Sequence, residues 1–296
     1  MDFKQLQFLC ALEKTRHFGA AAKECCVTQP TLSMRIQALE EELGLRLIHR
    51  GHRFEGFTAE GLQVLSRAKE LLAIQGTMKA EATAFKGQLV GRGCLGQVPL
   101  STLDPIPILD ELHKRHPQLS MSIINHHNDA LLDALLDNSL DAAIVYDEGI
   151  NDQAFVFQKL HQRGFELAFN PEKNADLLKQ GSLKWQELTG LPLGVLNATH
   201  LFRRHLDNIL TAESVSISTF LETDSVGLMM AAVEQGVCCA VIPEKYPHYN
   251  HDCVQTRSLG STQGNSVLPA LGVAIKRLTP LLPIGALLAE MLVEVS

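Results

Sequence analysis

The sequence predicts an α/β protein built from a small helical head, a long helix and a two-lobed α/β body. Residues 18–43 have the pattern of two helices joined by a tight corner, and residues 58–85 that of one long helix. From residue 91 onward, strand-like and helical segments alternate, which indicates doubly wound sheets with parallel strands. A chain of 296 residues is long enough for two or three such domains.

The two helices of residues 18–43 follow from capping and spacing. Cys26-Val27 form the corner, Thr28 is a good N-cap for the second helix, and Pro30 falls in its first turn, where a missing N–H costs little. Apolar residues then recur at spacings of four, three and four, so one stripe packs on the alanine-rich first helix. This stripe consists of Leu32, Ile36, Leu39 and Leu43. In a helix-turn-helix, N-terminal residues on the opposite side of the second helix face base edges in the major groove. These residues are Gln29, Thr31, Ser33, Met34 and Arg35.

A specific series of residues runs through positions 2–61. It contains Phe3, Leu6, Phe8, Leu9, Ala21-Ala22, Thr28-Gln29-Pro30, Ser33, Ile36, Leu39-Glu40, Leu43-Gly44, Leu47, Arg50, Thr58 and Gly61. In type and spacing, the series resembles the winged helix-turn-helix of the LysR-type transcriptional regulators. Three departures from the family pattern, His17, Ile48 and Phe57, are compatible with the fold.

The resemblance implies a DNA-binding head at residues 1–58, with a wing at residues 49–57. It also implies that the head's partner is double-stranded promoter or operator DNA. The implied DNA-binding residues are Thr28, Gln29, Pro30, Thr31, Ser33, Met34, Arg35, Arg50 and Arg53.

Charge is unevenly distributed between the head and the rest of the chain. The net charge is −7, but residues 1–88 hold 12 Lys/Arg against 10 Asp/Glu, whereas the remainder holds 14 against 23. This asymmetry is typical of a DNA-binding head on an acidic body. The head is only mildly basic, so DNA affinity requires a dimer and a few well-placed contacts, such as Arg35, Arg50 and Arg53.

No targeting or membrane segment is visible in the sequence. The N-terminus lacks a charged region followed by an apolar run, and no stretch approaches the ~20 apolar residues of a membrane span. We therefore expect a cytoplasmic protein with no membrane partner. The seven cysteines are odd in number and scattered, so we expect reduced thiols.

A long helical stretch, expected to form a linker helix at residues 59–88, follows the capping residue Thr58. A long helix with a narrow apolar stripe has no core of its own to face, so we expect it to pair with a second copy. The alternative is a helix packed on its own body. The family resemblance favours the dimer, and it implies that two dimers join through their bodies into a tetramer. The stripe consists of Leu62, Leu65, Ala68, Leu72, Met78, Ala82 and Phe85, and Gly76 weakens its middle.

The alternating segments beyond residue 91 are expected to form two lobes. The stretches GRGCLGQVP, NSLDAAIV and VEQGVCCAVIP occur in an order that resembles the two-lobed, periplasmic-binding-protein-like (type 2) sensor domain of the same family. The resemblance implies an effector-binding domain at 91–296, with lobe I at 91–162 and 267–296 and lobe II at 163–266. Glycines and short polar residues predict hinges at 87–93, 162–164 and 264–266.

Polar residues follow the strands of both lobes, where two-lobed α/β proteins bind small molecules. Helix N-termini at such sites suit a small anionic or polar effector. Leu100 stands where the family often carries a hydroxyl, so only Ser101 or Thr102 can supply one. For Thr199, Thr223 and Ser225, a role as N-caps alone is the alternative. The expected effector site comprises Ser101, Thr102, His126, Tyr146, Asn197, Thr199, His200, Phe202 and Thr223.

Metal, redox and catalytic chemistry find little support in the sequence. The histidines at 113 and 116, at 126 and 127, and at 248–253 give no recognised zinc spacing, so we expect no metal. A peroxide-sensing branch of the family carries a reactive cysteine in the loop that here reads Thr199-His200-Leu201-Phe202. No nucleophile elbow, phosphate loop or HExxH motif occurs, so we expect neither catalytic residues nor a cofactor. The alternative is a two-lobed solute-binding or catalytic α/β protein with an appended DNA-binding head.

Overall fold

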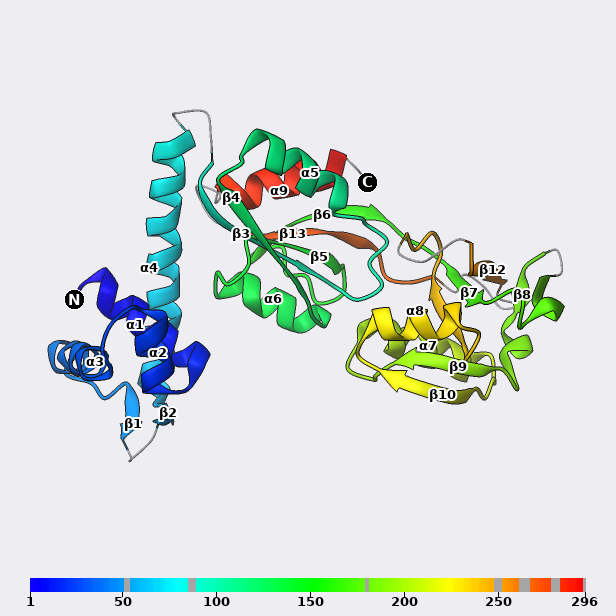
Figure 1. Cartoon of the computed structure of the whole chain (residues 1–296), viewed down its shortest axis with the longest axis horizontal. Coiled ribbons are helices and arrows are strands. Elements are labelled where there is room, and N and C mark those ends of the chain that lie inside the picture. Colours follow the sequence, from blue (N-terminus) through cyan, green and yellow to red (C-terminus); the bar gives the residue numbers. More distant parts are fainter. Residues whose placement is uncertain are drawn as a thin grey trace. The chain divides into compact units, whose positions relative to one another are not determined.

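A computed structural model describes residues 1–50, 54–84, 89–178, 181–247, 252–260, 267–277 and 283–294. The chain forms two compact units (Figure 1). Met1–Leu89 comprise the head and the long helix, and the body comprises Val90–Leu136 and Leu140–Ser296. None of the helices within the described ranges has both the length and the hydrophobicity needed to cross a bilayer.

Local capping interactions set the helix boundaries of the head. Asp2 forms a capping box at the start of the first helix, and Thr28 caps the third, which ends at Gly44 with a φ of 67°. His17 caps the second helix, because its Nδ1 accepts the N–H of Ala20 at 3.2 Å. The elements are α1 (Phe3–Thr15), α2 (Phe18–Glu24), α3 (Gln29–Leu43), the antiparallel wing strands β1 (Ile48–Arg50) and β2 (Phe54–Phe57), and α4 (Ala59–Ala84).

The predicted packing of α3 on the alanine-rich helix is confirmed. Leu32, Ile36 and Leu39 are buried in one core with Ala21 and Ala22. The small alanine side chains let the two helices approach closely. Leu43, the last member of the predicted stripe, is 37% exposed and lies outside this core.

The long helix α4 has two apolar sides rather than one stripe. Leu65 and Ala68 are buried in the head core and Leu72 packs against it, so the prediction that this side lacks an intrachain partner was wrong. Ala82 and Phe85, which complete the predicted stripe, carry side chains outside the described part. Two members of the predicted stripe, Leu62 and Met78, are exposed instead. Met78 forms an exposed set with Leu71 and Ile74, at spacings of three and four.

Lobe I contains a five-stranded sheet in the order β4-β3-β5-β13-β6. The first three strands run parallel, as predicted, whereas β13 is antiparallel to β5 and β6. Helices α5 and α9 cover one face of the sheet and α6 the other (Figure 1). The elements are β3 (Gly91–Gln97), α5 (Ile106–Arg115), β4 (Leu119–Asn125), α6 (Asn128–Leu136), β5 (Ala142–Tyr146), β6 (Phe155–His161), β13 (Leu271–Lys276) and α9 (Pro283–Glu294).

Lobe II contains a six-stranded sheet in the order β10-β9-β11-β7-β12-β8. Strands β9, β10 and β11 are parallel, and β7 is antiparallel to β11 and β12. Trp185 is fully buried with its ring centroid 5.5 Å from that of Phe165. The elements are β7 (Phe165–Phe169), β8 (Leu183–Lys184), β9 (Pro192–Leu196), α7 (Leu201–Ala212), β10 (Ser218–Thr223), α8 (Val226–Glu234), β11 (Cys239–Pro243), β12 (Gln255–Gly260) and the 3-10 turns Ala175–Leu178 and Trp185–Leu188.

Two features of the body differ from the sequence interpretation. Strands β6 and β12 were not predicted, because both carry polar residues without a clear alternation. Gly91 and Gly93 lie inside β3 rather than in a hinge. A Cβ at Gly93 would lie 2.6 Å from Sδ of Met121, so the glycine makes room for that side chain.

The chain crosses between the lobes at residues 162–164, between β6 and β7. Two hydrogen bonds tie this crossing to Leu268, which precedes β13. The Leu268 N–H donates to the Arg163 carbonyl at 3.0 Å, and Gln162 Nε2 donates to the Leu268 carbonyl at 3.1 Å. The other predicted crossing, at 264–266, lies outside the described residues.

Candidate functional site

The first turns of α3 carry exposed side chains of the kind that a helix-turn-helix presents to DNA. Thr28 and Thr31 are partly engaged with each other, because Thr28 Oγ1 accepts the Thr31 N–H at 3.4 Å and the two hydroxyl oxygens lie 2.8 Å apart. Met34 is 66% exposed. Gln29, Pro30 and Ser33 are also exposed. These positions are therefore accessible to base edges.

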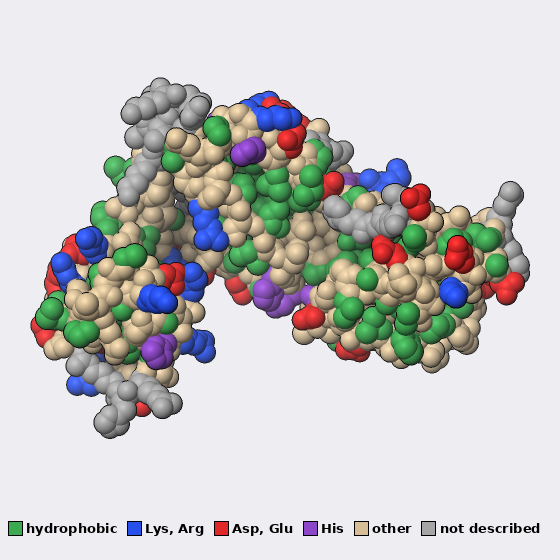
Figure 2. Space-filling model, in the orientation of Figure 1, with side chains coloured by type: hydrophobic (Ala, Val, Ile, Leu, Met, Phe, Trp, Pro, Cys, Tyr) green, Lys and Arg blue, Asp and Glu red, His purple; other side chains and the backbone are tan. Residues whose placement is uncertain are grey.

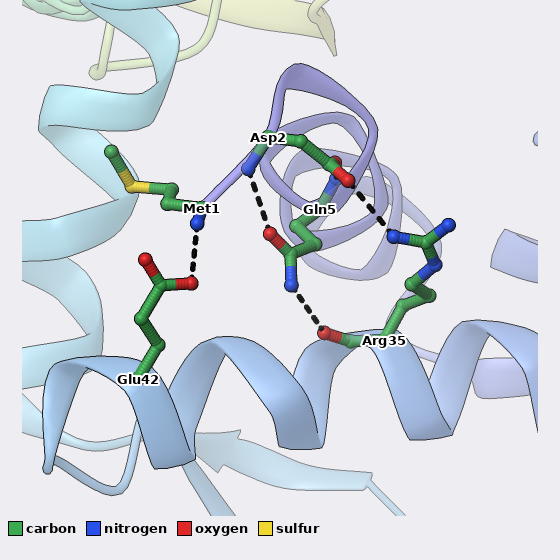
Figure 3. Close-up of polar contacts among 5 residues, drawn as sticks. All are labelled: Met1, Asp2, Gln5, Arg35 and Glu42. Atoms are coloured by element: carbon green, nitrogen blue, oxygen red, sulfur yellow. Dashed lines mark hydrogen bonds and ion pairs between the residues drawn. The ribbon is translucent and has the colours of Figure 1, made fainter.

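Arg35 is held by the start of α1 (Figure 3). Its Nη1 lies 2.8 Å from Asp2 Oδ2, and its carbonyl accepts a hydrogen bond from Gln5 Nε2 at 3.4 Å. The backbone N–H of Gln5 lowers the pKa of Asp2; burial opposes this effect, and the Arg35 charge adds a smaller lowering. Because both side chains of the ion pair are about half exposed, the pair is weak and Arg35 can exchange Asp2 for a phosphate.

A buried carboxylate joins α3 to the wing. Glu40 is 7% exposed, and its Oε1 accepts the N–H groups of Leu47 at 2.8 Å and Ile48 at 3.2 Å. The position of the wing relative to α3 is thereby fixed. Of the two predicted wing arginines, Arg50 ends β1 and Arg53 lies outside the described residues.

In lobe I, the predicted hydroxyl groups are used inside the fold. Ser101 is buried and its hydroxyl bonds the backbone of Leu103, whereas Thr102 Oγ1 lies 2.7 Å from Nε2 of His161. Tyr146 is also buried, and burial raises the pKa of its phenol above the usual range. Among the four residues predicted here, only His126 is exposed.

In lobe II, three of the predicted residues bond one another. The Thr199 hydroxyl donates to Asn197 Oδ1 at 2.5 Å, and the Asn197 N–H donates to the Thr223 carbonyl at 3.1 Å. Thr223 Oγ1 accepts the N–H of Ser225 at 3.1 Å. These contacts hold the loop before α7 against the loop before α8.

Capping explains some of the remaining lobe II residues. Ser225 caps α8, as the alternative interpretation held, but neither Thr199 nor Thr223 is an N-cap residue. His200 occupies the N-cap position of α7 without a side-chain capping bond. Phe202 is buried, with its ring centroid 5.6 Å from that of Phe165. It belongs to the lobe II core.

Histidines of the two lobes lie close together. His126 and His127 join β4 to α6, with ring centroids 4.3 Å apart, and His200 of lobe II is near both. Burial lowers the pKa of His200 and nearby His127 lowers it further, whereas Asp224 raises it. Burial and the neighbouring His127 also lower the pKa of His126. Figure 2 shows histidine side chains gathered on lobe I beside lobe II.

Four buried polar atoms lack a hydrogen-bond partner within the described part of the chain. Gln97 Oε1 lies at the carboxyl end of β3, and His200 Nδ1 at the start of α7. The other two are Arg163 Nε, at the lobe crossing, and Trp185 Nε1, in the lobe II core. The expected effector site did not include Gln97, His127 or Asp224. In the sequence, Gln97 is marked only by its place at the end of a strand, and His127 only by its neighbour His126. Asp224 is marked only by its position before a helix.

The described residues show no metal-binding cluster, and burial raises the pKa of three cysteine thiols in the body. The described residues contain no group of three or more His, Cys, Asp or Glu side chains arranged to hold a metal ion. Burial raises the pKa of Cys94 and Cys238, and raises that of Cys239 to about 11. A raised pKa keeps a cysteine in its less reactive thiol form.

Two family models match the chain. Residues 3–62 match the bacterial regulatory helix-turn-helix protein model of the lysR family, and residues 86–295 match the LysR substrate binding domain. The hydrogen peroxide-inducible genes activator of Dickeya chrysanthemi is 32% identical over 200 residues, which are 66% of this chain and 65% of that relative. The activator of the same name from Haemophilus influenzae is 29% identical over 242 residues, which are 80% and 79% of the two chains.

Solved structures share the fold along nearly the whole chain. A full-length OxyR variant from Pseudomonas aeruginosa has a TM-score of 0.71 at 23% identity and covers 99% of this chain and 94% of its own. CbnR in complex with its target DNA has a TM-score of 0.66 at 18% identity and covers 99% and 100%. The substrate binding domain model spans more than half of the chain, and the helix-turn-helix model spans the head. The chain therefore belongs to the LysR family of bacterial regulatory helix-turn-helix proteins.

Proposed function

We propose that the chain is a sequence-specific DNA-binding transcriptional regulator, switched by a small molecule that binds between lobes I and II. The observation that carries the proposal is the capped helix α3, which leaves Gln29, Pro30, Ser33 and Met34 exposed at its N-terminal end. Family membership supports the same function and argues against an enzyme. A regulator of this kind acts in the cytoplasm, where its DNA lies.

The proposed DNA contacts divide into two kinds. Gln29 and Ser33 face base edges, where a glutamine amide suits adenine. Arg35, released from Asp2, and the wing arginines Arg50 and Arg53 contact phosphates, which position the head without reading sequence. Domain boundaries at 58 and 88–91 remain the prediction made from the sequence.

Self-association is the second part of the proposal. The exposed side of α4 that carries Leu71, Ile74 and Met78 has the spacing of a helix-pairing stripe. A second copy of α4 would cover it and form a dimer, and two dimers would form the tetramer. A two-fold axis would then place two copies of α3 on related half-sites.

The third part concerns the effector. The hydroxyl groups of Ser101, Thr102 and Thr199 are engaged inside their own lobes, so ligand contacts fall to the remaining polar groups. Those groups are Gln97, His126, His127 and His200. A ligand that binds one lobe arrangement more tightly than another would bias rotation about residues 162–164.

Peroxide is not the proposed signal, although the relatives named above are hydrogen peroxide-inducible genes activators. The loop at 197–202 contains no cysteine, and the half-buried thiol of Cys94 and the buried thiols of Cys238 and Cys239 have raised pKa values. A reversible ligand is therefore the favoured switch.

A gel shift with DNA from upstream of the gene tests the proposal. The parent chain should retard this DNA in the presence of excess unrelated competitor, and a Gln29→Ala, Arg35→Ala double variant should not. Sedimentation should show a dimer or larger species at micromolar concentration. A parent that binds no DNA selectively, or a monomer with and without DNA, would refute the proposal.

A further inference from the structure

Two neighbouring imidazoles on lobe I have a defined tautomer. His126 Nδ1 accepts the N–H of His127 at 2.9 Å, and His127 Nδ1 accepts the N–H of Ala130 at 3.2 Å. An imidazole whose Nδ1 accepts a hydrogen bond carries its proton on Nε2 when neutral. Both rings therefore present an Nε2–H donor, and neither donor has a partner among the described residues.

The facing end of lobe II also presents backbone N–H donors. Helix α7 is 12 residues long and begins without a side-chain cap, so N–H groups of its first turn and the positive end of its dipole are uncompensated. His200, at this helix start, is only 8% exposed, and its Nδ1 has no partner within the described residues. A buried polar atom without a partner costs free energy that a ligand can recover.

The charged groups around this end of the cleft are few. Asp224 lies near His200, and it is the only carboxylate among the charged groups that perturb this ring. One turn into α7, His205 Nε2 contacts Glu148 of lobe I at 2.9 Å, which engages that carboxylate. Arg203 is occupied by Asp207, at 2.8 Å, and by the Leu196 carbonyl. Recognition here consequently depends on imidazoles and a helix terminus rather than on a guanidinium group.

We propose that the effector carries a carboxylate or another oxyanion that bridges His126 and His127 of lobe I to His200 and the start of α7 in lobe II, and that its binding takes up a proton at His200. This inference rests on the proposed function, because it specifies the chemistry of the effector and the pH at which the switch works. The shared oxyanion chemistry includes carboxylates and phosphates, which the experiment separates.

Proton uptake falls to His200 for a structural reason. Protonation of His126 or His127 would turn Nδ1 into a donor and break its bond to a backbone N–H, whereas Nδ1 of His200 has no such bond. Burial and nearby His127 lower the pKa of His200, which favours the neutral ring. A bound anion favours the charged ring and raises that pKa. Affinity is then highest at low pH and falls as pH rises through the pKa of the complex.

The test is binding of acetate, succinate, phosphate and sulfate to the full-length chain, measured by thermal shift and calorimetry against chloride at equal ionic strength. At least one anion should bind, about tenfold more tightly near pH 6 than near pH 8. Carboxylates and phosphate are tested separately, so the class of anion that binds more tightly identifies the oxyanion group of the effector.

Three variants and one control separate the roles of the histidines. His126→Asn and His127→Asn retain an acceptor near the Nδ1 position but lose Nε2–H, so each should weaken binding about tenfold. His200→Gln cannot take up the proton, so its affinity should be the same at both pH values. His113→Asn, on the exposed side of α5, removes an imidazole from the same lobe and should bind like the parent.

The proposal is overturned if no anion stabilises the parent more than these three variants, or if the pH dependence persists in His200→Gln. Gel shifts on the same samples keep this result distinct from the proposed function. Loss of anion binding with DNA binding intact contradicts only the oxyanion site. Absence of DNA binding in the parent contradicts the regulator assignment itself.

Discussion

The head and the body differ in whether their buried side-chain polar atoms all have partners among the described residues. In the head, Thr28, Glu40 and Thr58 each accept backbone N–H groups that would otherwise lack partners. In the body, Gln97 Oε1 and His200 Nδ1 are buried and have no partner among the described residues. The difference teaches that hydrogen bonds to the backbone hold the head in one conformation. In the body, unpartnered buried atoms could still hydrogen-bond a bound molecule.

The strongest test of a head with one fixed shape compares two glycines of α4. A Cβ at Gly61 would lie 2.0 Å from the Leu47 carbonyl oxygen, whereas nothing lies within 4 Å of a Cβ at Gly76. Gly61→Ala should destabilise the head by about 3 kcal/mol, because backbone must move. Gly76→Ala should stabilise it by about 1 kcal/mol through helix propensity. Urea unfolding followed by circular dichroism measures both, since the single tryptophan, Trp185, reports on lobe II. Equal effects of the two substitutions would contradict close packing at Gly61.

The next largest effect on the free energy of unfolding is expected for Glu40, the buried carboxylate of the head. Glu40→Ala removes the acceptor for two backbone N–H groups and should cost about 1–3 kcal/mol of unfolding free energy. The control is Glu41→Ala, on the exposed side, where Gln37 Nε2 donates to the carboxylate at 2.9 Å. Its expected change is within about 0.5 kcal/mol. If both variants unfold at the same urea concentration, Glu40 does not anchor the wing.

The DNA-reading end of α3 should show a comparable effect on binding rather than on folding. Gln29→Ala should lose about 1–3 kcal/mol of specific binding and relax the base preference at one position. Gln37→Ala, two turns further along the same helix, serves as the control and should bind like the parent. Fluorescence anisotropy with matched and mismatched duplexes measures both. If the Gln29→Ala variant had unchanged sequence specificity, a surface other than the start of α3 would have to contact the bases.

The smallest expected effect concerns oxidation. Because Cys94, Cys238 and Cys239 have raised pKa values, treatment with dilute peroxide should leave these three thiols unoxidised and should not switch DNA binding through them. The measurement is a gel shift before and after peroxide, with mass spectrometry to locate any oxidised cysteine. A reversible, thiol-dependent change in the footprint would show that cysteine oxidation controls DNA binding. It would contradict the proposal that a ligand bound between the lobes does so.

The two regions also differ in how far their structure could be predicted from the sequence. In the head, Thr28, Pro30 and Gly44 are local signals that specify where α3 begins and ends without reference to distant residues. The sides of α4 could not be assigned in this way. Whether Leu65 or Leu71 faces inward depends on packing against the head, which the spacing of apolar residues alone does not reveal.

In the cleft, positions could be predicted but partners could not. Thr102 follows β3 and Tyr146 ends β5, as expected. Yet Thr102 is bonded to His161, which lies far away in the sequence, and Tyr146 is buried. The proximity of His127 to His200 likewise arises only when two lobes fold against each other. Strands β6 and β12 were missed because their polar residues lack the alternation that marks a strand.

Enrichment of genomic DNA fragments on the full-length chain, followed by footprinting, tests the central claim most directly. The parent should enrich a short set of sequences with two half-sites related by a two-fold axis, each protected where α3 enters the major groove. The Gln29→Ala, Arg35→Ala variant should lose this enrichment while retaining the circular dichroism of the parent. Enrichment of no common sequence, or the same sequences recovered by the variant, would contradict the assignment of α3 as the element that reads DNA.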